Sequence, residues 1–334
     1  MAATILIDNQ IFSSEVLFGF PQDAAWKKNI YDALLEWQQE SDLSFTTSGS
    51  TGLPKEVRFS RDLVKQSADA TASFFGFNGQ IRALLALPAD KTGGKMMLYR
   101  ALLGGWTLHC VEPTGVPEIS AEFDFAAFTP HQLQRLLDER LKGLQSIKHI
   151  LIGGAPVSQV LTARLVEHGL HAFESFGMTE TLSHVALRKL SPVTSTVFEV
   201  IRPYTLLLDE RGCAVVQIPG LEDVHTNDLI EQVSSTEFRW IGRTDFVINS
   251  GGVKIQAEEV ERLLATSIPH PFYIGSVPHP TFGSAVVLVI EPGAMTEADI
   301  RAVCAKLKPT ERPKEVIFAP IAMKNGKIIR EIWS

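Results

Sequence analysis

The chain has 334 residues, 45% of them hydrophobic, with a formal net charge of -7 and a pI near 5.8. This length exceeds what one hydrophobic core usually serves, so we expect one large domain and a smaller one. The acidic balance disfavours nucleic acid and anionic membranes as partners, because both attract a broad positive field.

Cysteine spacing and apolar patterning indicate the cellular environment. Cys110, Cys213 and Cys304 lie far apart, which disfavours both a disulfide framework and a zinc site. The first 20 residues lack a basic flank before an apolar core, and no apolar run elsewhere is long enough to span a bilayer. We therefore expect a cytoplasmic protein without membrane insertion, and the sequence leaves a homo-oligomer open.

Short branched apolar runs alternate with segments of helical period, a pattern typical of parallel strands joined by crossover helices. The first amphipathic segment follows Pro21, with Trp26, Ile30, Leu34 and Trp37 on one stripe. Further along the chain we expect strands at Leu43–Thr46, Arg82–Leu87, Ile147–Ile152 and Ala285–Ile290, and helices at Gln132–Leu144 and Ser158–His168.

The pattern changes from Thr205 to Glu237, where short strand-like runs are separated by turn residues. This predicts β hairpins or a small barrel. A strand, a loop and a helix then follow at Phe246–Asn249, Ser250–Gly252 and Ala257–Thr266. We therefore predict two domains, 1–244 and 245–334.

A loop rich in hydroxyls and glycines, TSGSTGLPK, follows the first expected strand. Its glycines let backbone N–H groups turn inward, and its hydroxyls and lysine add donors, so the loop suits phosphate oxygens. It is not a Walker A loop, because Pro54 and Glu56 stand where that motif needs glycine and a hydroxyl. On composition alone, a solvated Ser/Gly linker is the competing interpretation.

Five segments occur in a fixed order from Thr47 to Arg330: TSGSTGLPK, FGMTE, TND, GRTDFVINSGGVKIQAEEVE and NGKIIR. They resemble the ordered signature motifs of the adenylate-forming superfamily of acyl-CoA synthetases, luciferases and peptide-synthetase adenylation domains. The resemblance implies an α/β fold with a large N-terminal domain, made of mixed sheets with helices plus a small β subdomain, and a small mobile α+β C-terminal domain. Members are usually longer, so the N-terminal domain is expected to be shortened.

The resemblance also implies a two-step reaction. A carboxylic acid attacks the α-phosphorus of ATP to give an acyl adenylate and pyrophosphate, and a thiol then displaces AMP. Positioning and charge stabilisation are what such an in-line displacement requires of a protein. The expected cofactors are ATP and Mg²⁺, with CoA as co-substrate. The motifs leave open a carrier-protein thiol as acceptor, and a regulator that binds ATP or AMP without turnover.

Each motif residue takes a role by this resemblance. Thr179 matches the α-phosphate contact and Glu180 the Mg²⁺ ligand, while Asp228 accepts both ribose hydroxyls and Arg243 reaches the ribose from the other side. The other residues expected around ATP are Thr47, Ser48, Gly49, Ser50, Thr51, Gly52 and Lys55 in the loop, and Gly154, Ala155, Phe176 and Gly177 beside the adenine.

The C-terminal motifs supply the remaining roles. Lys327 in NGKIIR matches the adenylation lysine, which would bridge the attacking carboxylate and the ester oxygen. Asp245 matches the hinge between the two half-reactions, and the loop with Gly251, Gly252 and Lys254 would then guide the thiol. The ordinary alternatives are a solvated lysine and a tight turn. The expected catalytic residues are Lys327, Thr179 and Glu180.

The segments Met178–Arg188 and LPADKTGGK look most like the short forms of the o-succinylbenzoate-CoA ligases of menaquinone biosynthesis. Lys91 stands where most members have an aromatic or histidine gate, and a lysine suits a second substrate carboxylate. We therefore hypothesise that an aromatic diacid is read by Lys91, Ser183, His184 and Arg188, with structural roles for His184 and Arg188 as the alternative.

Overall fold

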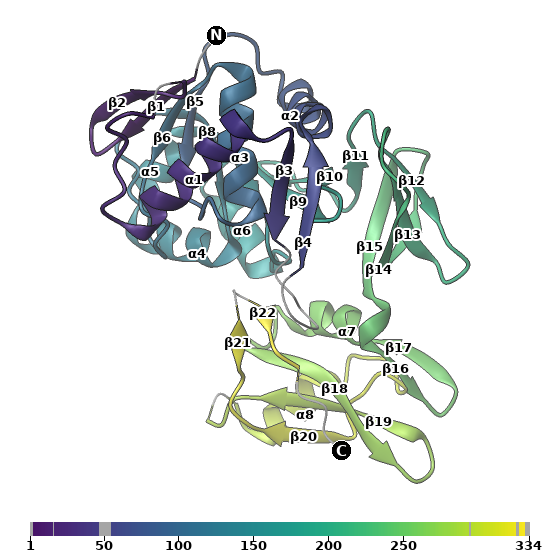
Figure 1. Ribbon diagram of the computed structural model, residues 1–334. Coiled ribbons are helices and arrows are strands. Elements are labelled where there is room, and N and C mark those ends of the chain that lie inside the picture. Colours follow the sequence, from purple (N-terminus) through teal and green to yellow (C-terminus); the bar gives the residue numbers. More distant parts are fainter. Residues whose placement is uncertain (1–2, 16, 47–54, 294, 325–326, 331–334) are drawn as a thin grey trace. The chain divides into compact units, whose positions relative to one another are not determined.

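The computed structural model describes residues 3–15, 17–46, 55–293, 295–324 and 327–330 (Figure 1). The chain forms two compact units. Unit 1 contains Met1–Val157, Thr162–Leu206 and Val216–Val224, and unit 2 contains Ser158–Leu161, Leu207–Val215 and His225–Ser334. The predicted domain boundary near Asp245 falls inside unit 2 and stays a prediction.

A mixed sheet runs through unit 1 in the order β11-β10-β9-β8-β7-β5-β6-β1-β2. The neighbouring strands from β9 through β8, β7, β5 and β6 to β1 pair in parallel. At the two edges, β2 pairs antiparallel with β1, β10 with β9, and β11 with β10. The expected α/β fold is thus confirmed. The strands are β1 Thr4–Ile7, β2 Gln10–Ser13, β5 Arg82–Leu85, β6 Thr107–Cys110, β7 Phe123–Phe128, β8 Ile147–Ile152, β9 Ala172–Met178, β10 Ser183–Ser191 and β11 Phe198–Val200.

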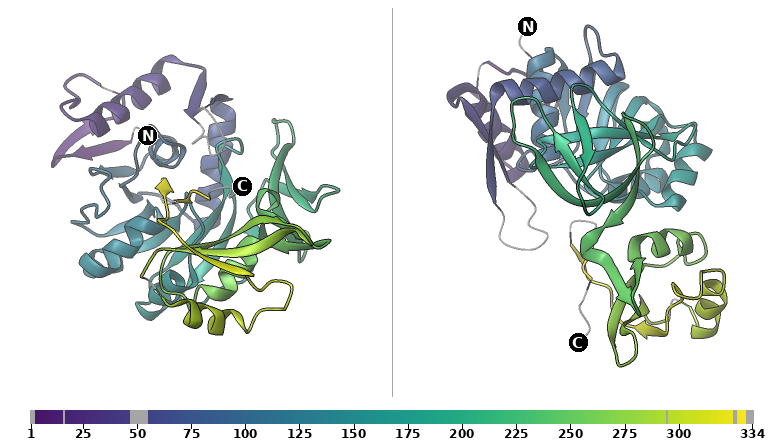
Figure 2. Two further views of the ribbon diagram at one scale, coloured as in Figure 1. Left: turned by 90° about the horizontal axis from the view of Figure 1, so that it is seen from below. Right: turned by 90° about the vertical axis from the view of Figure 1, so that its right-hand side faces the viewer.

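Helices lie against this sheet (Figure 1, Figure 2). Helix α3 packs on β5, β6, β7 and β10, and α2 packs on α3. A separate hairpin pairs β3 Asp42–Thr46 with β4 Glu56–Ser60. The helices are α1 Ala25–Gln39, α2 Arg61–Phe75, α3 Thr92–Gly104, α4 Pro130–Glu139, α5 Leu141–Gln145 and α6 Gln159–Glu167. Within the described part of the chain, every helix falls short of the length and apolarity that a bilayer crossing requires.

The expected single helix Gln132–Leu144 is wrong. Helix α4 begins with a capping box between Thr129 and Gln132 and ends at Glu139, because Arg140 takes φ -141° and ψ 36°. Helix α5 restarts at once and brings Gly143 against Ile119, where a Cβ would meet the isoleucine Cβ at 2.9 Å. The leucines on both sides of the break still face the same buried side. The apolar period alone therefore did not reveal the break.

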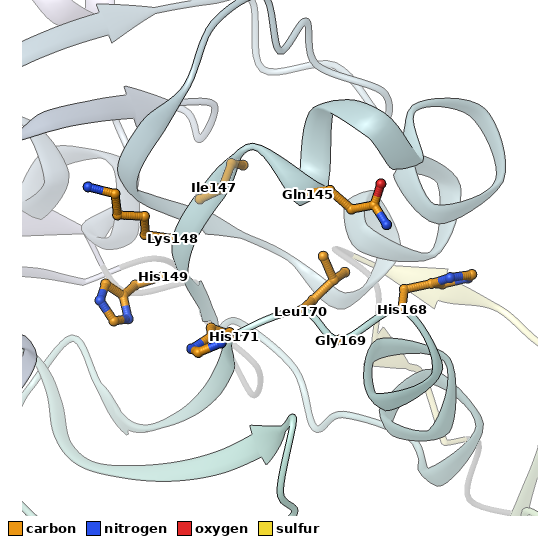
Figure 3. A pocket seen from close by; sticks show the side chains of 8 residues that line it. All are labelled: Gln145, Ile147, Lys148, His149, His168, Gly169, Leu170 and His171. Carbon is orange, nitrogen blue, oxygen red and sulfur yellow. The ribbon is translucent and has the colours of Figure 1, made fainter.

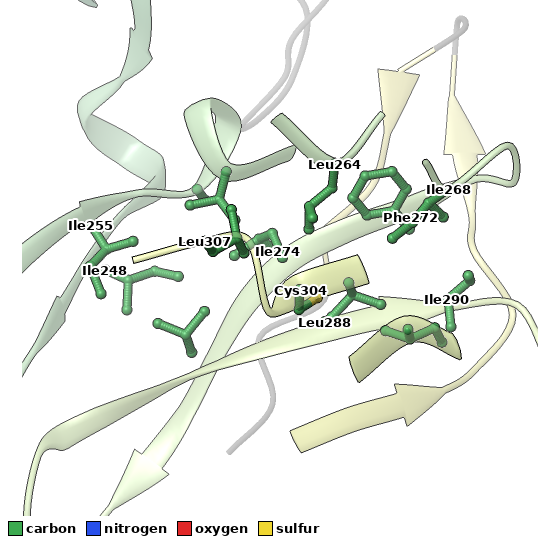
Figure 4. Close-up of a cluster of buried hydrophobic side chains, with 14 residues drawn as sticks. Ile248, Ile255, Leu264, Ile268, Phe272, Ile274, Leu288, Ile290, Cys304 and Leu307 are labelled. Carbon is green, nitrogen blue, oxygen red and sulfur yellow. The ribbon is translucent and has the colours of Figure 1, made fainter. Parts of the chain in front are cut away.

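Unit 2 has its own sheet, in the order β17-β16-β19-β18 with β20 beside β19. Side chains from this sheet and from helices α7 and α8 form one apolar cluster around Leu264, Ile274, Leu288 and Ile300 (Figure 4). Strands β12 to β15 are hydrogen-bonded in chain order, as the predicted hairpins require. The elements from residue 205 onward, which begin in unit 1 and continue in unit 2, are β12 Thr205–Leu208, β13 Cys213–Gln217, β14 Val224–Gln232, β15 Glu237–Arg243, β16 Val247–Ser250, β17 Val253–Gln256, α7 Ala257–Leu264, β18 Phe272–His279, β19 Gly283–Ile290, α8 Glu297–Cys304, β20 Glu315–Phe318, β21 Met323–Lys324 and β22 Lys327–Ile328, with a 3-10 turn at Thr244–Phe246.

Helix α3 approaches the preceding backbone so closely that any Cβ at position 94 would overlap it. A Cβ on Gly94 would lie 2.1 Å from the carbonyl oxygen of Pro88 and 2.7 Å from that of Leu87. A Cβ on the neighbouring Gly93 would meet only a leucine side-chain atom, at 3.2 Å. Backbone cannot yield as a side chain does, so this contact sets the depth at which α3 packs.

We expect Gly94→Ala to lower the free energy of unfolding by roughly 1–3 kcal/mol, because the overlap outweighs the helical preference of alanine. The matched control Gly93→Ala should be close to neutral. Urea unfolding followed by circular dichroism measures both changes. Equal stability of the two variants would contradict the close approach.

Glu258 is a partly buried carboxyl of α7 that accepts the backbone N–H of Arg243 at 2.6 Å. Burial, the largest effect, raises its pKa from 4.5 to about 7. The folded state therefore holds a proton on Glu258 at pH values where the unfolded chain has lost it. Stability contributed by this group is present below pH 4.5 and declines as the pH rises to about 7.

The variant Glu258→Gln should lose this pH dependence. Relative to the variant, we expect the wild-type free energy of unfolding to fall on the order of 2 kcal/mol between the pKa values of the unfolded and folded carboxyl. The difference is measured by urea unfolding, in which hydrogen exchange of peptides from unit 2 monitors the unfolding of that unit. Glu297→Gln, an exposed carboxylate of α8, is the control. A pH-independent difference would show that Glu258 is already ionised.

Candidate functional site

The carboxyl ends of parallel strands β8 and β9 carry the residues expected beside the adenine. Gly154 follows β8 and has φ 90°. Phe176 and Gly177 lie near the carboxyl end of strand β9. The ring of Phe176 is 5.9 Å from that of Phe198. Gly177 is required by a close approach, because a Cβ would lie 2.1 Å from the carbonyl oxygen of Ser183. Ala155 is half-buried beside Gly154.

A tight turn between β9 and β10 presents Thr179 and Glu180. Thr181 fixes this turn, because its hydroxyl accepts a hydrogen bond from the N–H of Met178 at 2.9 Å and donates one to Ser183 O at 2.7 Å. Leu182 takes φ 63° and donates its N–H to Thr179 O at 2.8 Å. A positive φ in a leucine is uncommon, and such strain is concentrated at functional sites.

Helix α3 reaches this turn and the β3–β4 hairpin. The hydroxyls of Thr92 and Thr179 are 2.9 Å apart. One turn later, Lys95 donates to Ser44 O of β3 at 2.7 Å and forms an ion pair with Glu36, which also accepts the N–H of Ser44. Residues 47–54 follow β3. Among the expected loop residues, Thr47, Ser48, Gly49, Ser50, Thr51 and Gly52 lie outside the described residues, and Lys55 is exposed.

A buried polar cluster lies between α2, α3 and β10. Arg100, 2% exposed, donates from Nε to the Thr71 hydroxyl at 3.1 Å and from Nη2 to the Ser183 hydroxyl at 3.0 Å. The Thr71 hydroxyl is also 3.1 Å from His184 Nε2. Within the described residues, no carboxylate forms an ion pair with Arg100. The cluster therefore holds a buried positive charge whose described hydrogen-bond partners are neutral hydroxyls.

Electrostatics distinguish the two bases of this cluster. Burial lowers the pKa of Arg100 to about 10, which still leaves the guanidinium protonated near pH 7. Burial, and then the charge of Arg100, lowers the pKa of His184 well below its usual value. His184 is therefore neutral, and Arg100 is the group that can attract an anion.

The structure separates the four residues predicted to read the acid. Ser183 accepts a hydrogen bond from Arg100, and His184 contacts the Thr71 hydroxyl that Arg100 also binds. Lys91 is exposed at the start of α3 and pairs with Asp90 at 2.9 Å. Arg188 donates from Nε to Glu174 at 3.0 Å, and its guanidinium lies 4.9 Å from the Phe198 ring centroid. The charge of Arg188 is thus already balanced, and its substrate role stays a prediction.

In unit 2, antiparallel pairing places Asp228 of β14 opposite Arg243 of β15. Their charged groups are 3.8 Å apart, and Trp240 Nε1 donates to the Asp228 carboxylate at 2.9 Å. Arg243 Nε also donates to Asp245 at 3.0 Å, and Asn227 donates to the other oxygen of Asp245 at 3.1 Å. The predicted ribose pair and the predicted hinge residue therefore share one network.

The remaining predicted residues of unit 2 occupy two hairpins. Gly251 and Gly252, at φ 58° and 82°, form the turn between β16 and β17, and Gly251 donates its N–H to Phe282 O at 2.9 Å. Lys254 is exposed in β17. Lys327 lies in β22, opposite Lys324 of β21.

A pocket of about 530 Å³ in unit 1 lies at the amino ends of β8 and β9 (Figure 3). Its lining includes His149, His168 and His171, and the His149 and His171 rings are 6.3 Å apart. Ligands of parallel sheets bind at the carboxyl ends of the strands, so we do not identify this pocket with the nucleotide site. Among the described residues, no group of three metal-ligating side chains converges.

Sequence reasoning missed Arg100, Thr71, Thr92 and Trp240. Arg100 offered one signal, because it is a charged residue within the apolar stretch MMLYRALL of α3. The other three have no such signal, because the part each plays in the site depends on a hydrogen-bond partner that is distant in sequence.

Comparison with known proteins identifies the family of the chain. The family described as AMP-binding enzyme matches residues 4–220. The structure of an acyl-CoA synthetase (AMP-forming)/AMP-acid ligase II-like protein from Dyadobacter fermentans is 34% identical, with a TM-score of 0.64 over 92% of this chain and 93% of that chain.

Longer relatives match as well. The 2-succinylbenzoate–CoA ligase of Escherichia coli is 28% identical over 311 residues, covering 87% of this chain and 68% of that protein. The o-succinylbenzoate coenzyme A synthetase of Bacillus subtilis, solved with ATP and magnesium, gives a TM-score of 0.72 at 22% identity over 83% of this chain and 66% of that chain, a likeness of fold. With a family match over most of its length, the chain belongs to the AMP-binding enzyme family.

Proposed function

We propose that this protein is an ATP-dependent acid–thiol ligase that activates o-succinylbenzoate as an acyl adenylate and transfers the acyl group to CoA. Pyrophosphate leaves in the first step and AMP in the second. Family membership and the similarity to 2-succinylbenzoate–CoA ligases support the reaction class. The buried Arg100, which forms no ion pair with a described residue, is the observation that carries the choice of a diacid.

The Thr179–Glu180 turn is proposed to hold the phosphates. The Thr179 hydroxyl is positioned by Thr92 and can donate to the α phosphate. Glu180 offers a half-buried carboxylate, and Mg²⁺ is commonly bound through one or two carboxylates together with substrate phosphates. The donor set therefore fits Mg²⁺, which when bound would neutralise charge on the pyrophosphate. Loop residues Thr47–Gly52 and Lys55 are proposed to supply further donors.

Arg100 is proposed to read the ring carboxylate of o-succinylbenzoate. A buried guanidinium without an anionic partner is costly, and a charged hydrogen bond to a carboxylate would relieve that cost. Ser183, which accepts from Arg100, adds a hydroxyl beside it, and the neutral His184 fixes Thr71 behind it. The succinyl carboxylate would remain for attack on the α-phosphorus.

Residues of unit 2 are proposed to hold the ribose and assist the first step. Asp228 keeps acceptor capacity beyond its bond from Trp240, which suits two ribose hydroxyls, and Arg243 lies beside it. Lys327 is proposed to stabilise the charge that develops on the attacking carboxylate. Asp245 is proposed as the hinge, and the Gly251–Gly252 turn with Lys254 as the guide for the CoA thiol.

ATP–pyrophosphate exchange with a panel of carboxylic acids, followed by thioester formation with CoA, tests the proposal. We expect exchange with o-succinylbenzoate well above that with other acids, and a CoA thioester as product. Exchange followed by acylation of a carrier protein instead of CoA would reassign the acceptor. ATP binding without exchange for any acid would identify a nucleotide-binding regulator and overturn the proposal.

Replacement of Arg100 separates recognition of the diacid from the chemistry. We expect Arg100→Met to lower kcat/KM for o-succinylbenzoate on the order of 10²-fold, because the ring carboxylate loses a charged partner. Activity with 4-oxo-4-phenylbutanoate, which lacks that carboxylate, should change little. The comparison variant Arg188→Met, which unpairs Glu174, should reduce stability and affect both acids equally. Loss of both activities in folded Arg100→Met would contradict the assignment.

A further inference from the structure

Arg330, the last residue of NGKIIR, has a partly buried anionic partner in helix α7. Its Nη1 and Nη2 donate to Glu261 Oε1 and Oε2 at 2.5 and 2.7 Å, which makes a bidentate ion pair. The two side chains are 16% and 19% exposed. The ion pair of Arg301 and Glu297 on α8 is instead 51% and 50% exposed, so only the first pair is held away from solvent.

Further contacts join this pair to two other elements of unit 2. Arg330 Nη1 donates to Ile274 O of β18 at 3.0 Å, and Glu261 accepts the N–H of Ile274 at 2.7 Å. The guanidinium carbon lies 4.3 Å from the ring centroid of Phe246, the residue after the predicted hinge Asp245. Stacking on an aromatic face adds to the orientation that the bidentate pair imposes.

The chain leading to Arg330 is fixed as well. Ile329 donates its N–H to Ala322 O at 2.8 Å, and β22 pairs with β21 through Ile328 and Met323. Ile328 packs on the apolar cluster of Tyr273, Val287 and Val289. The strand that carries Lys327 is therefore held by contacts of Ile328, Ile329 and Arg330, the three residues that follow the lysine.

We propose that Arg330 and Glu261 are positioning residues for the adenylation step, because they hold the Lys327 strand on α7 and connect it to Phe246, the neighbour of the predicted hinge residue Asp245. The inference rests on the proposed function, which gives Lys327 its role. Neither residue is placed on substrate, so both act through the backbone of 327–330. A displacement of about 1 Å at a reacting group can cost on the order of 10²-fold in rate.

The test compares Arg330→Gln, Glu261→Gln, the double variant and the conservative Arg330→Lys with wild-type protein. Arg301→Gln is the matched control, because it removes an exposed arginine–glutamate pair of the same unit. ATP–pyrophosphate exchange measures adenylation, and thioester formation from preformed acyl adenylate measures the second step. Circular dichroism melting and hydrogen exchange of the 321–330 peptide report folding and local order.

We expect each Gln variant to lower kcat of exchange by about 10- to 10²-fold, with KM for ATP and acid within about threefold of wild type. The second step should change less than about threefold, and the double variant should be no worse than either single one. Arg330→Lys should recover part of the lost rate, since lysine keeps the charge without the bidentate geometry. Hydrogen exchange of the 321–330 peptide should accelerate.

Several results would overturn the inference. Unchanged exchange in folded Arg330→Gln, or equal loss in both half-reactions, would assign the pair to stability alone. Where Gln variants melt below the assay temperature, Arg330→Lys supplies the same comparison. Wild-type protein that exchanges with no acid would overturn the proposed function, and the inference with it. Normal wild-type exchange with unaffected variants would overturn only the inference.

Discussion

The packing depth of helix α3 is the constraint on which the site in unit 1 depends. Gly94 lets the helix lie directly on the backbone of Leu87 and Pro88. Thr92, Lys95 and Arg100 project from the same helix to the β9–β10 turn, to the middle of β3 and to the buried cluster behind Ser183. One rigid helix thus supports the proposed phosphate and acid contacts together, so a shift of α3 would disturb all of them.

Two arginines, the buried Arg100 of unit 1 and the partly buried Arg330 of unit 2, have different surroundings. Unit 1 keeps the Arg100 guanidinium among hydroxyls and a neutral histidine, which leaves its charge available to an anion. Unit 2 neutralises Arg330 with Glu261, although burial acts as the largest effect to raise the pKa of that carboxyl. An unpaired buried charge favours binding of an opposite charge, whereas a paired one favours a fixed geometry. This difference is why we assign recognition to Arg100 and positioning to Arg330.

Local patterns were sufficient for much of the fold. The expected strand Ile147–Ile152 matches β8, and hairpins follow Thr205 as the turn residues indicated. The helix expected at Gln132–Leu144 failed because the leucine period continues across the non-helical Arg140. For the proposed acid site, the sequence singled out Ser183 and His184 but not Arg100, whose partners are separated from it by 29 and 83 positions.

The sequence by itself determined the family and the order of its motifs, because glycines, hydroxyls and lysines at fixed spacing are read along the chain. It also determined which residues are candidates for phosphate, ribose and hinge roles. Tertiary structure alone decided which charges are already paired: Arg188 meets Glu174 across the β9–β10 pair, and Arg330 meets Glu261 across 69 positions. The physical reason is that the energy of a charge depends on burial and on its neighbours, and both are set by packing between distant segments.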